Sequence, residues 1–149
     1  MLRFHARSHP GIVRPQNEDA VLADGGNGVF VVADGVGGRA AGEVASALTI
    51  ETMEAACPRI SAAVSKYAEA PEWEGRNVVL EIMEEVCQAA SKRVFDEAEI
   101  RGKKGMTTTL VLLVVGGGTA FLAHVGDSRA YLIREGPIQR GRAPCGARA

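Results

Sequence analysis

The sequence predicts a single layered α+β domain, because strand-like and helix-like patterns follow one another in blocks along the chain. Strand patterns occupy the first 34 residues, two stretches with apolar residues at helical spacing follow, and three further strand-like runs come after them. Helices in such an order must cover sheet faces that would otherwise be exposed. The 149 residues are 46% hydrophobic and 23% charged, which suffices for one core.

The N-terminal block predicts a β meander. Residues 2–6 and 18–23 have the composition of strands, and the clearest strand runs from Gly28 to Asp34 after the turn-forming sequence DGGNG. This strand ends in one acid followed by glycines. A carboxylate at such a position is costly unless a partner there requires it, so the sequence raises the question of what Asp34 holds.

Two helices are predicted after these glycines. The first covers 40–57, where Pro58 ends the apolar periodicity. The second covers about 75–100, and its apolar stripe lies opposite a row of Glu, Gln and Lys residues. The segment between the helices contains two prolines and predicts a partly helical connection.

The C-terminal block predicts three consecutive strands joined by short turns. They are MTTTLVLLVV (106–115), TAFLAHV (119–125) and RAYLIR (129–134), separated by GGG and GDS. Residues 136–149 hold three Gly, three Arg, three Ala and two Pro, which is the composition of a tail rather than of a further element.

Composition and charge exclude several classes of protein. With 17 basic and 18 acidic residues the net charge is -1, so no general attraction to nucleic acid or to an anionic membrane is predicted. The longest apolar run is far shorter than the roughly 20 residues of a membrane helix, and the N-terminus lacks the apolar stretch of a signal peptide. Cys57, Cys87 and Cys145 have neither a disulfide-framework nor a zinc-ligand spacing. These features predict a cytoplasmic protein.

Acidic residues at element ends and turns are candidate metal ligands. Glu18 and Asp19 lie at the start of a predicted strand, Asp34 ends another, and Asp127 lies in a turn. Oxygen donors without Cys or His at ligand spacing suit Mg²⁺ or Mn²⁺. Gly35 leaves room for an ion bound by both the Asp34 carboxylate and its own carbonyl.

Each of these residues also has an ordinary structural explanation. An Asp-Gly pair after a strand is a common turn, the acids at 18 and 19 could begin a solvated strand, and GDS is a usual hairpin turn. Arg14 is either a surface charge or an anion-binding group. His124 lies in a strand and is predicted to have a hydrogen-bonded structural role, and Cys57 and Cys87 are predicted to pack inside helices.

Four segments taken together resemble the metal-dependent protein serine/threonine phosphatases, the PPM or type 2C family, in its bacterial form. They are RPQNEDA (14–20), VVADGVGGRAAGEVAS (31–46), MTTTLV (106–111) and GDSRAYLI (126–133), in the order and approximate spacing of that family. The resemblance covers residues 1–135, a little more than half of the family's catalytic domain, and leaves 136–149 as an atypical tail. It implies an α-β-β-α sandwich of two central antiparallel sheets, with the metal centre at one end between them.

The resemblance implies a role for each candidate acid. Asp34 would bridge two Mn²⁺ or Mg²⁺ ions, Gly35 would supply a backbone carbonyl, and Glu18 would ligate the second ion directly or through water. Asp19 resembles an acid just outside the ligand set, and Asp127 resembles the acid that helps to hold a third, more labile ion.

The implied reaction is hydrolysis of phosphoserine or phosphothreonine in proteins by a metal-bound water, without a covalent enzyme intermediate. Arg14 matches the arginine that binds the substrate phosphate, a role that its planar donors suit. Phosphoproteins, and a cognate serine/threonine kinase, would be the partners.

The chain departs from the family in three places. Val36 stands where some relatives have His, and Thr107 stands where Gly is more usual. After residue 135 the family continues with Asp-His-Ser and with two aspartates that complete the first metal site, and these are absent. The incomplete set predicts low or no activity alone and uncovered sheet edges and faces. Alternative hypotheses are a non-catalytic phosphatase-like module that binds phosphoproteins, and a product that does not fold stably.

Overall fold

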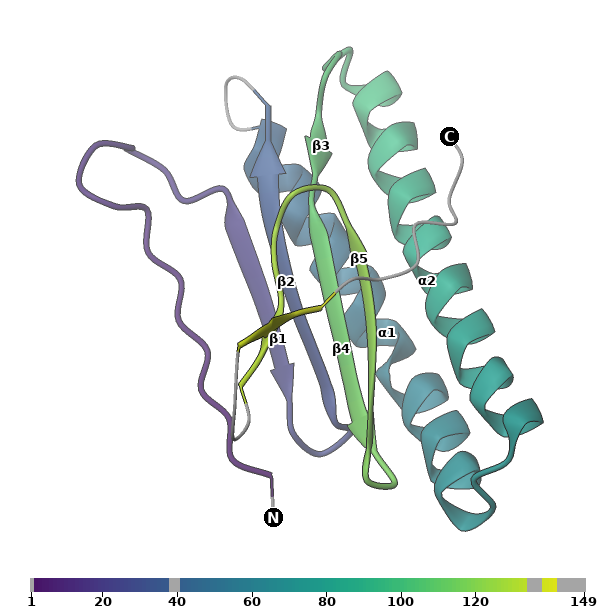
Figure 1. Cartoon of the computed structure of the whole chain (residues 1–149). Helices are drawn as coiled ribbons and strands as arrows, with labels where there is room; N and C mark the ends of the chain where they lie inside the picture. Colours follow the sequence, from purple (N-terminus) through teal and green to yellow (C-terminus); the bar gives the residue numbers. More distant parts are fainter. Residues whose placement is uncertain (1, 38–40, 134–137, 142–149) are drawn as a thin grey trace.

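The computed structural model describes residues 2–37, 41–133 and 138–141, which form a sheet covered on one face by two long helices (Figure 1). The elements in chain order are β1 (Asp19–Asp24), β2 (Val29–Val36), α1 (Ala41–Glu69), α2 (Trp73–Ile100), β3 (Thr107–Thr108), β4 (Leu110–Gly116), β5 (Thr119–Val125), β6 (Tyr131–Leu132) and β7 (Gln139–Arg140). This order of strands, helices and strands confirms the predicted α+β class.

The main sheet has five strands in the order β1-β2-β4-β5, with β3 paired to β2. All of its pairs are antiparallel. The helical pair is inserted in sequence between the neighbouring strands β2 and β4. The end of β2 is therefore held on both sides, by β1 on one edge and by β3 on the other.

The core lies between the helices and one face of this sheet. Side chains alternate along β2, so Val29 and Val31 are 0% and 1% exposed, whereas Val32 on the opposite side of the sheet is 47% exposed. The core cluster consists of sheet residues Val29, Val31, Leu110, Leu112, Val114 and Phe121 and helix residues Met53, Cys57, Ile60, Val64, Val79, Met83, Val86 and Ala90. The predicted packing role of Cys57 is confirmed.

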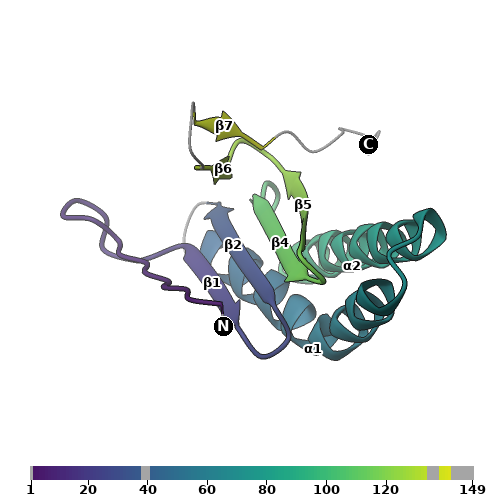
Figure 2. The same ribbon diagram turned by 60° about the horizontal axis from the view of Figure 1, so that its bottom comes forward.

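We call the other side of the sheet the open face. By strand register and alternation it carries Val21, Phe30, Val32, Val111, Leu113 and Leu122. Figure 2 shows β6 and β7 on this side, opposite α1 and α2.

The first helix is longer than predicted. It continues through Pro58 to Glu69, and only three residues separate it from α2. Pro58 has no N–H for the helical ladder, but its neighbours Cys57 and Ile60 are 2% and 0% exposed in the core. Tertiary packing of this buried stripe therefore outweighs the local helix-breaking tendency. The predicted start at residue 40 lies outside the described residues.

Two strand predictions are wrong in detail. Residues 2–6 form no strand, although the Phe4 ring packs on Phe30 of β2. In RAYLIR only Tyr131–Leu132 is a strand, and it pairs with Gln139–Arg140 instead of with β5. β7 lies in the segment predicted to be a tail, which corrects the expectation that this segment adds no element.

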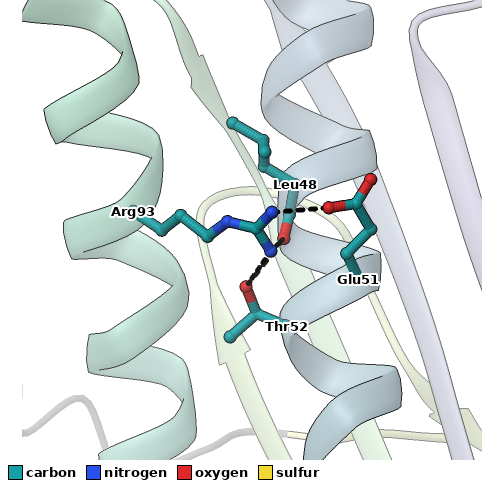
Figure 3. A network of polar contacts seen from close by, with 4 residues as sticks. All are labelled: Leu48, Glu51, Thr52 and Arg93. Carbon is teal, nitrogen blue, oxygen red and sulfur yellow. Dashed lines mark hydrogen bonds and ion pairs between the residues drawn. The ribbon is translucent and has the colours of Figure 1, made fainter.

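Polar contacts on the exposed side join α1 to α2 (Figure 3). Arg93 of α2 donates to the Glu51 carboxylate at 2.6 Å, to the Thr52 hydroxyl at 3.2 Å and to the Leu48 carbonyl at 3.5 Å. One guanidinium thus satisfies three acceptors along one turn of α1, which fixes the register of the two helices.

Within the described residues no helix is long and apolar enough to cross a membrane.

Replacing Arg93 by alanine should lower the free energy of unfolding by about 0.5–1.5 kcal/mol, because the three contacts are partly exposed and water can replace them. Urea denaturation followed by circular dichroism measures this change. Lys92→Ala is the matched control, since Lys92 makes only an ion pair with Asp96 inside α2 and should cost less than about 0.5 kcal/mol. Equal losses for both variants would show that the interhelical contacts add no stability.

Candidate functional site

Asp34 lies near the end of β2, where three strands meet. In the β1–β2 ladder it is opposite Asp19, and β3 pairs with the two residues that follow it. Its side chain is half-buried and follows Val32 by two positions, so it lies on the open face. The structure therefore brings the Asp34 and Asp19 carboxylates together at one end of this face.

The surroundings of Asp19 raise the pKa of its carboxyl group. Desolvation raises the pKa of Asp19, and the negative charge of Asp34 and a hydrogen bond with it raise this pKa further, while Arg14 acts in the opposite direction. Two carboxylates on neighbouring strands favour either a shared proton or a cation between them. The position is therefore suited electrostatically to a positive ion.

Glycines allow Glu18, the end of β2 and the start of α1 to approach closely. The Gly35 N–H donates to the Glu18 carbonyl at 3.1 Å. A Cβ on Gly35 would lie 2.0 Å from the Gly42 carbonyl oxygen, and a Cβ on Gly42 would lie 2.9 Å from the Glu18 carboxyl carbon. The Glu18 carboxyl group is thus placed beside the first turn of α1, where the helix dipole favours negative charge.

Thr109 connects Asp34 to the turn that carries Asp127. The Thr109 hydroxyl accepts a hydrogen bond from the Asp34 N–H at 3.2 Å, and the Thr109 N–H donates to the Asp34 carbonyl at 2.9 Å. The same hydroxyl shares a hydrogen bond of 2.6 Å with Ser128. Asp127 is exposed and lies next to Ser128 in this turn, so its backbone is tied to Asp34 through two hydroxyl groups.

Replacing Thr109 by valine should therefore lower the free energy of unfolding by about 1–3 kcal/mol, because the isosteric side chain leaves the Ser128 hydroxyl and the Asp34 N–H without their shared partner. Chemical denaturation of both proteins measures the loss. Thr109→Ser retains the hydroxyl and should recover most of the stability. If serine were as destabilising as valine, retaining the hydroxyl would not be enough to keep the stability, and the hydrogen bonds alone would not explain the loss.

Arg14, His124 and Cys87 lie outside this network of contacts. Arg14 is exposed and forms no ion pair with another described residue. His124 differs from its predicted hydrogen-bonded role, because its Nδ1 is buried without a partner in the described part of the chain. Burial raises the pKa of Cys87 to about 11, so this thiol is protonated at neutral pH. Cys145 lies outside the described residues.

Three residues of this region were missed by sequence reasoning. Thr109 and Ser128 could have been chosen from the sequence, because short hydroxyl side chains at strand ends often form hydrogen bonds with nearby backbone groups. Gly42 gave no local signal, because the group that it approaches is 24 residues earlier in the chain. A helical glycine shows its purpose only when its neighbour in space is known.

The donors present fit a divalent cation in part. Carboxylates and a backbone carbonyl are the ligands that Mg²⁺ and Mn²⁺ prefer. Across residues 2–37, 41–133 and 138–141, however, no three Asp, Glu, His or Cys side chains are grouped closely enough to hold an ion. The described residues thus supply an incomplete site.

Comparison with known proteins points to one family. The family model described as protein phosphatase 2C matches residues 13–142. The chain is 35% identical over 139 residues to serine/threonine protein phosphatase PstP of Mycobacterium tuberculosis, covering 93% of this chain and 24% of PstP. It is 33% identical over 131 residues to serine/threonine phosphatase stp of Listeria monocytogenes, covering 86% of this chain and 48% of that protein.

A solved structure agrees with these sequence matches. The catalytic domain of PstP in complex with two manganese ions superposes with a TM-score of 0.75 and 33% sequence identity, over 93% of this chain and 54% of that one. The chain therefore spans about half of the solved domain and half or less of the relatives' full lengths.

Proposed function

Because the chain belongs to the protein phosphatase 2C family, we propose that it is part of a serine/threonine phosphatase that hydrolyses phosphoserine and phosphothreonine in proteins. One observation carries this proposal: Asp34, near the end of β2, lies opposite Asp19 of β1, and Gly35 makes a close approach to Glu18 beside them. The partial coverage of the relatives supports a contribution to a catalytic unit rather than a complete one.

In this proposal the Asp34 and Glu18 carboxylates and the Gly35 carbonyl would hold Mn²⁺ or Mg²⁺, and Asp127 would contribute to a further ion. Such ions, when bound, lower the pKa of a bound water and offset the charge on the phosphoryl group. Asp19, opposite Asp34 in the β1–β2 ladder, would orient the Asp34 carboxyl group.

Arg14 would bind the substrate phosphate. Its guanidinium is exposed, and its planar donors match two phosphate oxygens. The substrates would be cytoplasmic phosphoproteins, and a serine/threonine kinase that phosphorylates them would act in opposition.

A non-catalytic module that binds phosphoproteins is the second candidate. It is favoured by the finding that the described residues contain no group of three metal-ligating side chains. In such a module Arg14 would still bind a phosphate group, but no water would be activated beside it.

Mn²⁺ titration calorimetry and phosphothreonine-peptide hydrolysis by the whole chain test these candidates together. We expect weak Mn²⁺ binding that Asp34→Asn reduces at least tenfold. Asp96→Asn is the matched control, because Asp96 lies on the exposed side of α2 and pairs only with Lys92. Unchanged Mn²⁺ binding in Asp34→Asn would contradict the metal role. Peptide binding that Arg14→Ala removes, without any turnover, would favour the non-catalytic module.

A further inference from the structure

A cavity of about 220 Å³ lies at the edge of the main sheet, between the helices and the strands β3, β4 and β5. Its floor is buried, since Thr49, Ala90 and Leu110 are at most 4% exposed. Its mouth is formed by exposed side chains, among them Phe95 and Val125, which are 64% and 52% exposed. Protein interiors contain few gaps larger than a water molecule, so an opening of this size is a candidate binding site.

The cavity separates two clusters of buried side chains. Ala90 and Leu110 belong to the main core, whereas Val94 and Met106 belong to a second, smaller cluster. All four side chains line the cavity. A ligand in it would therefore join the two clusters and remove apolar surface of both from water, which favours binding.

The charge of the cavity lining selects an uncharged ligand. Among the described residues, no charged side chain lines the cavity. The charged residues of α2 that lie near it in sequence have partners elsewhere, because Lys92 pairs with Asp96 and Arg93 pairs with Glu51 of α1. An ionised ligand would lose its hydration here without gaining a counter-charge, and this loss is costly.

The same lining favours an aromatic ligand. Phe95 presents a ring at the mouth and Met106 contributes a polarizable thioether inside, and both groups form favourable contacts with aromatic rings. Thr49 and Thr108 add hydroxyl-bearing side chains, which suit a ligand with one polar group. An apolar cavity of roughly 150 Å³ can hold benzene, so this larger one admits a somewhat larger ring system.

We propose that this cavity binds a small uncharged aromatic molecule, and that the bound ligand stabilises β3 against the end of β2. Thr107 and Thr108 line the cavity, and they form β3, which pairs with the last two residues of β2. The next residue, Thr109, donates its N–H to the Asp34 carbonyl. A ligand in the cavity thus acts on the strand that holds the Asp34 end of β2 in place. This inference goes beyond the proposed function and requires neither an ion nor phosphatase activity.

Titration calorimetry of the whole chain with indole, an uncharged bicyclic probe with one N–H donor, tests this site. We expect a dissociation constant on the order of 1 mM or below, the range of a ligand of this size. Phe95→Ala should weaken binding about threefold or more, because the aromatic side of the mouth is lost. Trp73→Ala should leave binding unchanged. It is the matched control, since Trp73 lies on the same helix, is 65% exposed and does not line the cavity.

Alkylation of Cys87 by iodoacetamide, followed by mass spectrometry, locates the bound probe. Cys87 lines the cavity and is half-buried. At an indole concentration ten times the dissociation constant its reaction should slow about tenfold, because only the empty cavity exposes the thiol. Hydrogen exchange of residues 107–109 should slow in the same samples, as expected if β3 is stabilised against β2.

Three results would overturn the site: no indole binding, unchanged alkylation of Cys87, or equal weakening by Phe95→Ala and Trp73→Ala. A dimer of the chain that Phe95→Ala dissociates, measured by sedimentation velocity, would also overturn it, because the occupant would then be a second copy. Indole binding without slower exchange at residues 107–109 would overturn the proposed effect on β3.

Discussion

Gly35→Ala is expected to lower the free energy of unfolding by more than about 3 kcal/mol and to abolish Mn²⁺ binding at Asp34. The added Cβ would lie 2.0 Å from the Gly42 carbonyl oxygen and 2.6 Å from the Glu18 carbonyl oxygen. Both obstacles are backbone atoms, so no side-chain rotation relieves the clash. The end of β2 would have to leave either β1 or the first turn of α1. A loss of this size is a large fraction of the stability of a small domain.

Urea denaturation and Mn²⁺ calorimetry measure these two effects. Gly26→Ala is the matched control, because its Cβ would meet only the Asp24 carboxylate at an ordinary 3.4 Å and should change stability by less than about 0.5 kcal/mol. If Gly35→Ala were as stable as Gly26→Ala, the close contact between the end of β2 and the first turn of α1 would not require a glycine at residue 35. Preserved stability with lost Mn²⁺ binding would instead limit the role of Gly35 to ligand geometry.

The parts of the fold that sequence predicted correctly are those with strong local periodicity. The continuous apolar run of β2 and the apolar stripe of α2 are both patterns among neighbouring residues, so each can be recognised from the sequence. The end of the first helix was predicted wrongly at Pro58, because proline breaks helices locally. The burial of neighbouring residues in the core, which stabilises α1 beyond this point, could not be seen in the sequence. The pairing of β6 with β7 was missed because a two-residue strand has no period to recognise.

In the candidate site, too, some residues could be predicted from local sequence patterns and others could not. Asp34 and Asp19 could be selected from their places at the ends of strands, and their contact follows from the register of one hairpin. The approach of Gly42 to Glu18 and the link from Thr109 to Ser128 depend on elements far apart in the chain. Local patterns therefore identified the carboxylates but not the groups that fix their positions.

The two neighbouring leucines of β4 give a direct test of which sheet face is buried. Leu112 is 0% exposed and lies in the core opposite Val31, whereas Leu113 is half-buried on the open face. Leu112→Ala should lower the free energy of unfolding by about 2–5 kcal/mol, because the helices cannot close the cavity that it leaves. Leu113→Ala removes the same atoms from the same strand, but in the chain alone it should cost less than about 1 kcal/mol.

Urea denaturation with a constant m-value compares these variants, since an unchanged slope shows that compactness is retained. Equal destabilisation by both substitutions in the chain alone would show that the open face is already covered.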